Sequence, residues 1–307
     1  MLPTRQGSFR LFRIAGIDVF LHWSWIIVAT FIIGQRAREY SSLTWNVLEY
    51  LALFSIVLLH EFGHALACRQ VGGRANQIVL WPLGGVAYVA PPPRPGATLW
   101  SLAAGPLVNV VLLPALILLW FVGRGLGWEA SAPNAYKFVQ TVAFINVGLL
   151  TFNLLPVYPL DGGQILRCLL WYAMGPTRSL RAASGFGFVG VALLVALAVK
   201  AQSIWIGILS MFIAMSCWNA WKQSRVMAAA ESLPRRAGVA CPACQRPPPV
   251  GPFWLCAKCR TPFDTFDSHG ACPQCGEQFH TTQCLDCGAS RPWSEWIREP
   301  APVPPRL

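Results

Sequence analysis

Charged side chains are scarce in this chain of 307 residues. They make up 12% of it, with 13 Asp and Glu against 24 Lys and Arg, whereas hydrophobic residues make up 54%. Soluble domains are usually about one quarter charged. The shortage of charge therefore excludes an ordinary soluble enzyme and indicates a polytopic membrane protein.

Long apolar runs are confined to residues 1–225, where we expect an all-α membrane unit of about six spans. A helix needs ~20 mostly apolar residues to cross a bilayer. The runs that approach this length are residues 19–34, 47–68, 99–123, 138–174, 186–199 and 204–221. Pro156 and Pro159 cannot continue a regular helix, so the fourth span is predicted to be broken.

The distribution of Lys and Arg predicts the orientation. With six spans and an inside N-terminus, the inside segments carry twelve Lys and Arg and the outside segments carry five. The positive-inside rule then predicts a multi-pass protein of the cell membrane with both termini cytoplasmic. The net charge of +11 is explained by this bias and by a role in attraction to anionic membrane lipid. We therefore expect no nucleic-acid partner.

An H-E-x-x-H motif, formed by His60, Glu61 and His64, lies in the second predicted span. Side chains four residues apart share one helix face, so both imidazoles can bind one zinc ion. The glutamate between them can take the proton of zinc-activated water. Ionisable groups inside a membrane helix are costly, which favours a functional site.

A catalytic zinc site needs a third protein ligand, and carboxylates are few here. Between residues 45 and 230 they are Glu49, Glu61, Glu129 and Asp161. Glu49 precedes His60 by more than three helical turns, and Glu129 lies in a polar loop. Asp161 remains, in the break of the fourth span, where irregular backbone can line a wet cavity. Asp161 is therefore the predicted third ligand.

The motif and the segment Asn153-Leu-Leu-Pro-Val-Tyr-Pro-Leu-Asp-Gly together resemble the hallmarks of the site-2 protease family of intramembrane zinc metalloproteases. Ala104-Gly-Pro-Leu-Val-Asn109 resembles a further signature of that family. The resemblance covers roughly residues 10–220 and extends in particular to the compact bacterial branch that includes the sporulation factor processing protease. It implies an endopeptidase that cuts a partner membrane protein in or near a transmembrane segment.

The resemblance also implies residue roles. His60, His64 and Asp161 would bind the catalytic zinc, and Glu61 would be the general base. Asn153 would donate a hydrogen bond to the tetrahedral oxyanion, with interhelical hydrogen bonding as the alternative. Asn109 is a candidate for substrate contact, although interhelical hydrogen bonding is the favoured role for it.

Residues 77–90 are rich in β-branched and aromatic side chains around Pro82-Leu-Gly-Gly85. This pattern predicts a short membrane-associated hairpin near the zinc. A protease binds its substrate extended, and a free strand edge can hold such a segment by strand addition. Gly84, Gly85 and Val86 are therefore candidate substrate-binding residues.

Eight of the eleven cysteines lie in four C-x-x-C pairs after residue 231. The pairs are Cys241 and Cys244, Cys256 and Cys259, Cys272 and Cys275, and Cys284 and Cys287. Eight thiolates suffice for two closed Cys₄ zinc sites, and a reducing cytoplasm disfavours disulfides. The spacing leaves open which pairs combine. We expect a protease core at 1–225, a linker at 226–240, a double zinc ribbon at 241–290 and a Pro-rich tail at 291–307.

The expected cofactors are thus one catalytic and two structural zinc ions. The tail mixes basic and acidic residues without a basic stripe, so a protein partner, or the mouth of the enzyme itself, is favoured over nucleic acid. The alternative function is a membrane zinc transporter or sensor. Such a protein would not require Glu61 between two metal ligands.

Overall fold

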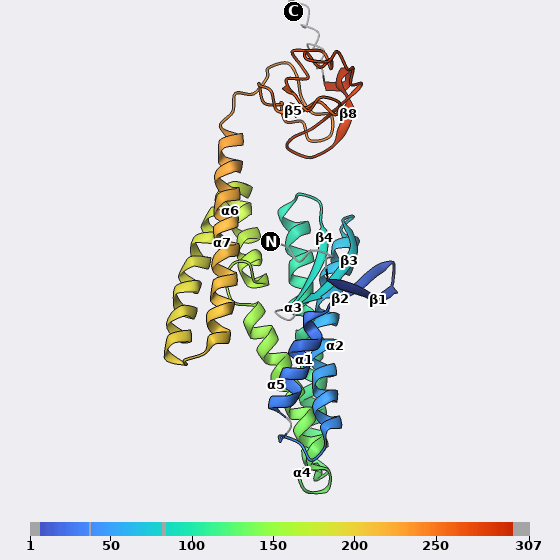
Figure 1. Ribbon diagram of the computed structural model, residues 1–307, viewed down its shortest axis with the longest axis vertical. Helices are drawn as coiled ribbons and strands as arrows, with labels where there is room; N and C mark the ends of the chain where they lie inside the picture. The colour runs from blue at the N-terminus through green and yellow to red at the C-terminus, as the bar shows by residue number, and fades with distance from the viewer. Residues whose placement is uncertain (1–6, 37, 82–83, 297–307) are drawn as a thin grey trace, which may run out of the picture. The chain divides into compact units, whose positions relative to one another are not determined.

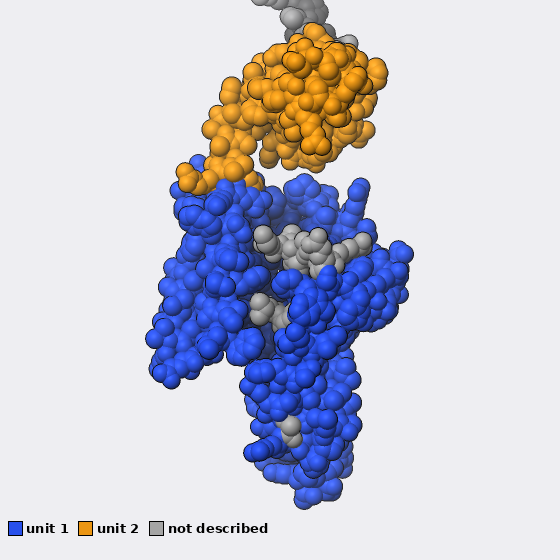
Figure 2. Space-filling model, in the orientation of Figure 1, with its two compact units in different colours: residues 1–224 blue, residues 225–307 orange. Residues whose placement is uncertain are grey.

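The computed structural model describes residues 7–36, 38–81 and 84–296. The chain divides into two compact units, Met1–Ser224 and Arg225–Leu307, which Figure 2 colours separately. The first unit is mostly helical and contains the H-E-x-x-H motif. The second contains the four C-x-x-C pairs.

Five helices among the described residues are long and apolar enough to cross a membrane. They are α2 (Leu43–Gln70), α3 (Pro95–Gly125), α5 (Pro133–Asn153), α6 (Asp161–Lys200) and α7 (Ile204–Glu231), drawn in Figure 1. One short helix, α4 (Trp128–Ser131), lies between α3 and α5. These helices agree with a multi-pass membrane protein.

The predicted first span, residues 19–34, is only partly helical. Helix α1 (Ser24–Gln35) has 12 residues, about 18 Å of helix, which is shorter than the ~30 Å hydrocarbon core. The residues before it form strand β2 (Ile17–His22), which pairs antiparallel with β1 (Ser8–Ile14) across Ala15 and Gly16. Both turn residues have positive φ, 50° and 74°, as a two-residue hairpin turn requires.

The expectation of an all-α membrane unit is therefore corrected. The described residues include a sheet with the strand order β1-β2-β3-β4. β2 pairs parallel with β3 (Arg74–Trp81), and β3 pairs antiparallel with β4 (Gly84–Ala90). The predicted hairpin is thus present, although Pro82 and Leu83 at its turn lie outside the described residues. An apolar run long enough for a span fits a buried strand and a short helix equally well, and length alone does not separate the two.

The sheet packs on the C-terminal half of α2. Ile78, Val79 and Leu80 of β3 are 0% exposed, and Ile78 and Leu80 share a buried cluster with Ala65 and Cys68 of α2. Because this packing fixes β3, it also fixes β4, its neighbour at the edge of the sheet.

The fourth predicted span is broken in the expected place. Helix α5 ends at Asn153 and α6 begins at Asp161. A Cβ atom at Gly162 would lie 2.3 Å from the Leu154 carbonyl oxygen, and one at Gly163 would lie 2.4 Å from the Tyr158 nitrogen. The start of α6 therefore folds back against the loop that precedes it, and side chains larger than glycine would separate the two.

The segment labelled α6 is interrupted at Gly175, at the predicted end of the fourth span. It continues to Lys200 through a kink at Gly175, where φ is 79° and ψ is 173°, followed by Pro176. The backbone at Gly175 is not helical, so Asp161–Lys200 consists of two helices joined at the kink. They correspond to the second part of the predicted fourth span and to a helix that contains the predicted fifth span, residues 186–199.

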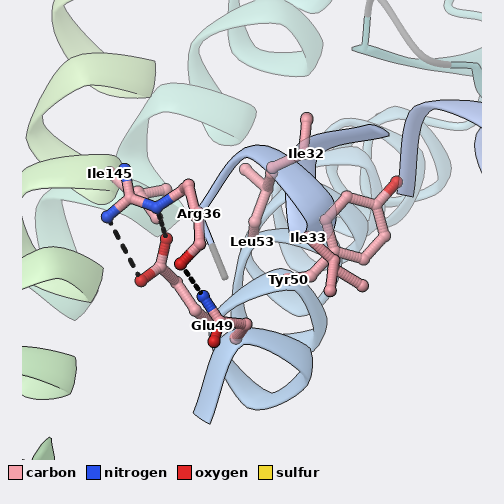
Figure 3. Close-up of a pocket in the computed structure, with 8 residues that line it drawn as sticks. Ile32, Ile33, Arg36, Glu49, Tyr50, Leu53 and Ile145 are labelled. Carbon is pink, nitrogen blue, oxygen red and sulfur yellow. Dashed lines mark hydrogen bonds and ion pairs between the residues drawn. The ribbon is translucent and has the colours of Figure 1, made fainter. Parts of the chain in front are cut away.

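An ion pair ties the end of α1 to α2 (Figure 3). Nε of Arg36 lies 2.9 Å from Oε1 of Glu49, which is buried. The Tyr40 hydroxyl donates to the same carboxylate, and the Asn46 amide donates to the Arg36 carbonyl. Arg36, Asn46 and Glu49 line a cavity of about 20 Å³. Glu49 is thus engaged in this contact, consistent with its exclusion from the predicted zinc ligands.

The second unit consists of turns, short strands and one 3₁₀ helix. β5 (Trp254–Leu255) pairs with β6 (Pro262–Phe263), β7 (Thr281–Gln283) pairs with β8 (Ser290–Pro292), and η1 (Trp293–Trp296) follows. Its core combines cysteines with Trp254, Phe266 and Trp296.

Residues on both sides of segment 241–290 belong to this unit. Trp296 is 0% exposed, and its carbonyl accepts the Ala240 amide. Arg235 pairs with Asp286 at 2.7 Å, and Arg236 pairs with Asp264 at 2.7 Å. Residues 297–307 of the predicted Pro-rich tail lie outside the described residues.

Candidate metal centres

Both histidines of the motif are buried in α2. His60 is 5% exposed and His64 is 7% exposed. Their ring centres are 4.8 Å apart and their Nε2 atoms are 3.1 Å apart. The two rings therefore converge on one point, as their helical spacing predicts.

Asp161, at the first residue of α6, completes the cluster. Its Oδ2 lies 3.0 Å from Nε2 of His60 and 3.4 Å from Nε2 of His64. Ligand atoms at ~2.0–2.2 Å from a tetrahedral zinc are separated by roughly 3.3–3.6 Å. The three observed separations of 3.0, 3.1 and 3.4 Å lie within or just below this range. Two nitrogens and one carboxylate oxygen can therefore serve as three zinc ligands and leave a fourth position for water or substrate.

Helix α3 passes close to this cluster because of its glycine. A Cβ atom at Gly105 would lie 2.3 Å from Nε2 of His64 and 2.8 Å from Nε2 of His60. One at Gly63 of α2 would lie 2.6 Å from the Ala104 carbonyl oxygen. Small residues let membrane helices approach closely, and here they make room for the metal ligands.

Glu61 is 6% exposed and is held by the edge strand β4. Its Oε2 accepts the backbone N–H of Ala87 at 2.8 Å. A Cβ atom at Gly85 would lie 2.3 Å from Cγ of Glu61 and 2.7 Å from its Oε1. The hairpin therefore contacts the candidate base directly, and Gly85 provides the space for its carboxylate.

The Nδ1 atoms of both histidines, remote from the cluster, have hydrogen-bond partners on α3. Nδ1 of His60 lies 2.6 Å from Oδ1 of Asn109, and Nδ1 of His64 lies 2.8 Å from the Ser101 carbonyl oxygen. Metal-ligating histidines typically donate their second N–H in this way, which fixes the tautomer that leaves Nε2 free for the metal.

Asn109 is itself held by Asn146 of α5. Nδ2 of Asn109 donates to Oδ1 of Asn146 at 2.8 Å, and Nδ2 of Asn146 donates to the Asn109 carbonyl at 3.0 Å. Both residues are 0% exposed. Asn109 therefore makes hydrogen bonds to both α2 and α5, and its contact with substrate stays a prediction. Sequence reasoning missed Asn146 and Ser101, whose only sequence signal is a polar residue in an apolar helix.

The remaining predicted residues lie at the margins of the site. Asn153 is half-buried at the last residue of α5, at the other end of the loop that leads to Asp161. Gly84 and Val86 are half-buried in β4 on either side of Gly85.

The eight tail cysteines form two nested clusters. Cys241 and Cys244 meet Cys284 and Cys287, with two sulfur–sulfur distances of 3.8 Å, and Cys256 and Cys259 meet Cys272 and Cys275, with two of 3.6 Å. Tetrahedral thiolates at ~2.3 Å from zinc are roughly 3.8 Å apart. The first pair therefore combines with the fourth and the second with the third, which the spacing left open.

All four pairs share one backbone turn. The residue after the second cysteine of each pair donates its N–H to the carbonyl of the first, at 2.8–2.9 Å, and has a φ between 58° and 73°. These residues are Gln245, Arg260, Gly276 and Gly288.

One of the tail thiols is also more acidic than usual. Hydrogen bonds from Thr261 lower the pKa of Cys259 to about 6, which favours the thiolate that binds metal.

Comparison with known proteins gives a consistent set of relatives. The model of peptidase family M50 matches residues 49–128 and 123–197. A zinc metalloprotease of Methanocaldococcus jannaschii is 32% identical over 221 residues, which is 72% of this chain and 61% of that protein. The stage IV sporulation protein FB of Bacillus subtilis is 34% identical over 126 residues, which is 40% of this chain and 41% of that protein.

A solved structure, a site-2 protease from Methanocaldococcus jannaschii, is also similar. It is 28% identical with a TM-score of 0.52, and the match covers 70% of this chain and 95% of that one. The putative zinc metalloprotease Rip3 of Mycobacterium tuberculosis is 29% identical over 60% of this chain and 49% of its own length. The chain thus spans about half to three fifths of the curated relatives matched over most of it.

Proposed function

The chain belongs to peptidase family M50, the family of the site-2 proteases, and on that premise we propose that it is an intramembrane zinc endopeptidase. Its substrate is a partner membrane protein, cut in or near a transmembrane segment. The observation that carries this proposal is the convergence of His60, His64 and Asp161 beside Glu61 within apolar helices. Such polar groups are costly in apolar helices, so their presence there favours a functional site within the membrane.

We assign one catalytic zinc ion to His60, His64 and Asp161. Zinc held there would lower the pKa of water toward ~7 and polarise the scissile carbonyl. The donor separations of 3.0–3.4 Å and the absence of a fourth protein ligand from the described cluster support an open catalytic site over a closed structural one.

Glu61 is the proposed general base. Since its Oε2 is held by Ala87, Oε1 is the oxygen that takes the proton of the attacking water and then passes it to the leaving amine. Asn153 is the proposed donor to the oxyanion, because a neutral amide stabilises that charge without burying a second one.

The free edge of β4 is the proposed substrate-binding strand. The Ala87 N–H bonds to Glu61 rather than to β3, so the edge of β4 that faces away from β3 faces the base. Alternate residues of a strand direct their backbone N–H groups to the same edge, so Gly85 and Val89 face the same free edge as Ala87. An extended substrate added there would pass directly by Glu61, with Gly84, Gly85 and Val86 along its path.

The two cysteine clusters are proposed as structural zinc sites. Each offers four thiolates and no open position. We propose that the double zinc ribbon serves as a protein-interaction module. The charge bias of a six-span arrangement predicts both termini on the cytoplasmic side, and this orientation stays a prediction, since the described residues contain five candidate spans.

Substitution of Glu61 by Gln tests the proposal. Removal of the base should lower cleavage of co-expressed single-span proteins by about 10²- to 10⁴-fold, while purified protein keeps its three zinc ions. Fragment proteomics on membranes with wild-type or Glu61→Gln protein would identify the substrate, with Glu129→Gln, on exposed α4, as the control. Retained cleavage, or zinc flux that Glu61→Gln leaves unchanged, would instead favour a transporter or sensor.

Proline substitution tests the β4 edge. Val89→Pro removes an N–H from the free edge and should raise KM while zinc content stays unchanged. Tyr88→Pro removes an N–H directed at β3 and serves as the control for damage to the hairpin. If Val89→Pro protein cleaves normally, the substrate is held elsewhere.

A further inference from the structure

Asn146 lies in α5 and is linked through Asn109 to His60, one of the three proposed metal ligands. We infer that Asn146 is a positioning residue that fixes the tautomer of His60. This inference rests on the proposed zinc site. It adds α5 to the helices that position the zinc ligands. Three buried side chains, one each from α2, α3 and α5, form the link.

The direction of every hydrogen bond in this link follows from its far end. Asn146 reaches the backbone carbonyl of Asn109 at 3.0 Å, and a carbonyl can only accept, so the group that reaches it is the Asn146 NH₂. The Asn146 oxygen must then accept from the NH₂ of Asn109, at 2.8 Å. The Asn109 oxygen therefore faces Nδ1 of His60, at 2.6 Å, and requires a proton on Nδ1.

This proton decides whether His60 can bind metal. A neutral imidazole carries one N–H and one lone pair, so a proton on Nδ1 leaves the Nε2 lone pair directed at the cluster with Asp161 and His64. If the Asn109 amide rotated by half a turn, its NH₂ would face Nδ1 and favour the opposite tautomer, which cannot bind through Nε2. Asn146 opposes that rotation because its oxygen would then meet the oxygen of Asn109.

The tautomer of His64 does not depend on a side-chain amide. Its Nδ1 faces the backbone carbonyl of Ser101 at 2.8 Å, and a backbone carbonyl cannot exchange donor for acceptor. The two ligands therefore differ: His64 is oriented by main chain, whereas His60 is oriented by an amide that itself needs a holder. This difference is why Asn146 should affect metal binding specifically.

The experiment uses the full chain, purified in detergent. Asn146→Leu should weaken zinc binding at the catalytic site by about 10- to 100-fold, the range for partners behind a metal ligand, as measured by competition with a chelator. It should also lower kcat while KM for a single-span substrate stays unchanged, and it should alter the visible spectrum of the cobalt-substituted protein. Asn46→Leu removes another buried asparagine, on α2, and should change none of these three readouts.

Asn146→Asp is the rescue variant. A carboxyl group buried among apolar helices stays neutral, so its OH can donate to the Asn109 carbonyl and its C=O can accept from the Asn109 amide. Zinc affinity should remain within about threefold of wild type. Folded Asn146→Leu protein with wild-type zinc affinity and kcat would overturn the inference, and so would Asn146→Asp protein that loses as much zinc as Asn146→Leu.

A double variant covers the case in which Asn146→Leu alone does not fold. Asn109→Asp presents an acceptor oxygen to His60 in either orientation, so adding Asn146→Leu to it should weaken zinc binding by less than about threefold. A further loss as large as that expected for Asn146→Leu would contradict the inference. If wild-type protein binds no zinc that depends on His64, the proposed function fails instead, and the two failures are thereby distinguished.

Discussion

In the membrane unit, the candidate zinc ligands His60 and Asp161 are 101 positions apart in sequence, and packed helices bring them together. In the cysteine-rich unit, each pair of ligands comes from a single turn, repeated four times with one backbone geometry. The first cluster is therefore assembled by the packing of helices. We expect the second unit, with a small core of cysteines and a few aromatic rings, to depend on bound zinc for folding. Small domains commonly need such metal support.

The largest expected effect is the unfolding of the cysteine-rich unit when zinc is removed. Removal of zinc by a strong chelator should unfold residues 232–296 and leave the apolar helices, including α7 up to Glu231, intact, because structural zinc contributes about 10–16 kcal/mol to such modules. Limited proteolysis followed by mass spectrometry would reveal it as rapid cleavage after residue 231. Equal protection of both units without zinc would show that the cysteine unit has a sufficient core of its own.

Gly105→Ala should have the next largest effect, confined to the catalytic site. Its Cβ atom would lie 2.3 Å from Nε2 of His64, so the ligands must shift, and cleavage should fall by at least about 100-fold, as misplacement of about 1 Å can do. Catalytic zinc should also be lost, while both structural zinc ions remain. Metal analysis and a cleavage assay would measure this.

Gly148→Ala on α5 is the matched control, since a Cβ atom there meets nothing within 4 Å. It should keep full activity and zinc. If Gly105→Ala behaves like Gly148→Ala, α3 has freedom to move away from the ligands, and the site is less rigid than the packing indicates.

The three residues that the sequence assigns to the catalytic zinc lie together in the structure, and they could be selected because few other residues in the spans can bind a metal. Scarcity of carboxylates pointed to Asp161, and Pro156 and Pro159 pointed to the break that presents it. Asn146 and Ser101 could not be found in this way. An asparagine in an apolar helix has many bonding options, and a backbone carbonyl has no sequence signature, so only helix packing reveals what they contact.

The same limit explains the errors in the fold. Residues 19–34 are mostly apolar, so their division into a buried strand and a short helix depends on pairing with β3, which lies more than 50 residues away in the chain. The pairing of the cysteine turns likewise depends on the path between them. Local chemistry could be predicted in both regions, whereas partners distant in sequence could not.

One cysteine cluster is enclosed in sequence by the other, so loss of the inner cluster should affect zinc binding at the outer one more than the reverse. The expected effect is of intermediate size. Cys256, in the inner cluster, lies within the segment enclosed by Cys241 and Cys287. Loss of the inner cluster lengthens the disordered loop that the outer one must close and removes part of the core between them. Cys256→Ser should therefore weaken zinc binding at the outer cluster by about tenfold, whereas Cys241→Ser should leave the inner cluster within about threefold. Zinc titration of the full chain would measure both, and equal effects would mean that the clusters fold independently.

The smallest expected effect lies at the Arg36–Glu49 ion pair, the other buried polar contact of α2 (Figure 3). Glu49→Gln keeps the size of the side chain and removes its charge. Since Arg36 is 39% exposed, water partly screens the pair, and the loss of stability should be about 1–2 kcal/mol. The melting temperature in detergent would fall by a few degrees, against no change for Glu129→Gln.

The Glu49→Gln protein should still cleave its substrate, because this contact holds α1 and not the ligands. If Glu49→Gln abolished cleavage as fully as Gly105→Ala, the two buried polar regions of α2 would be coupled, and the position of α1 would belong to the catalytic machinery.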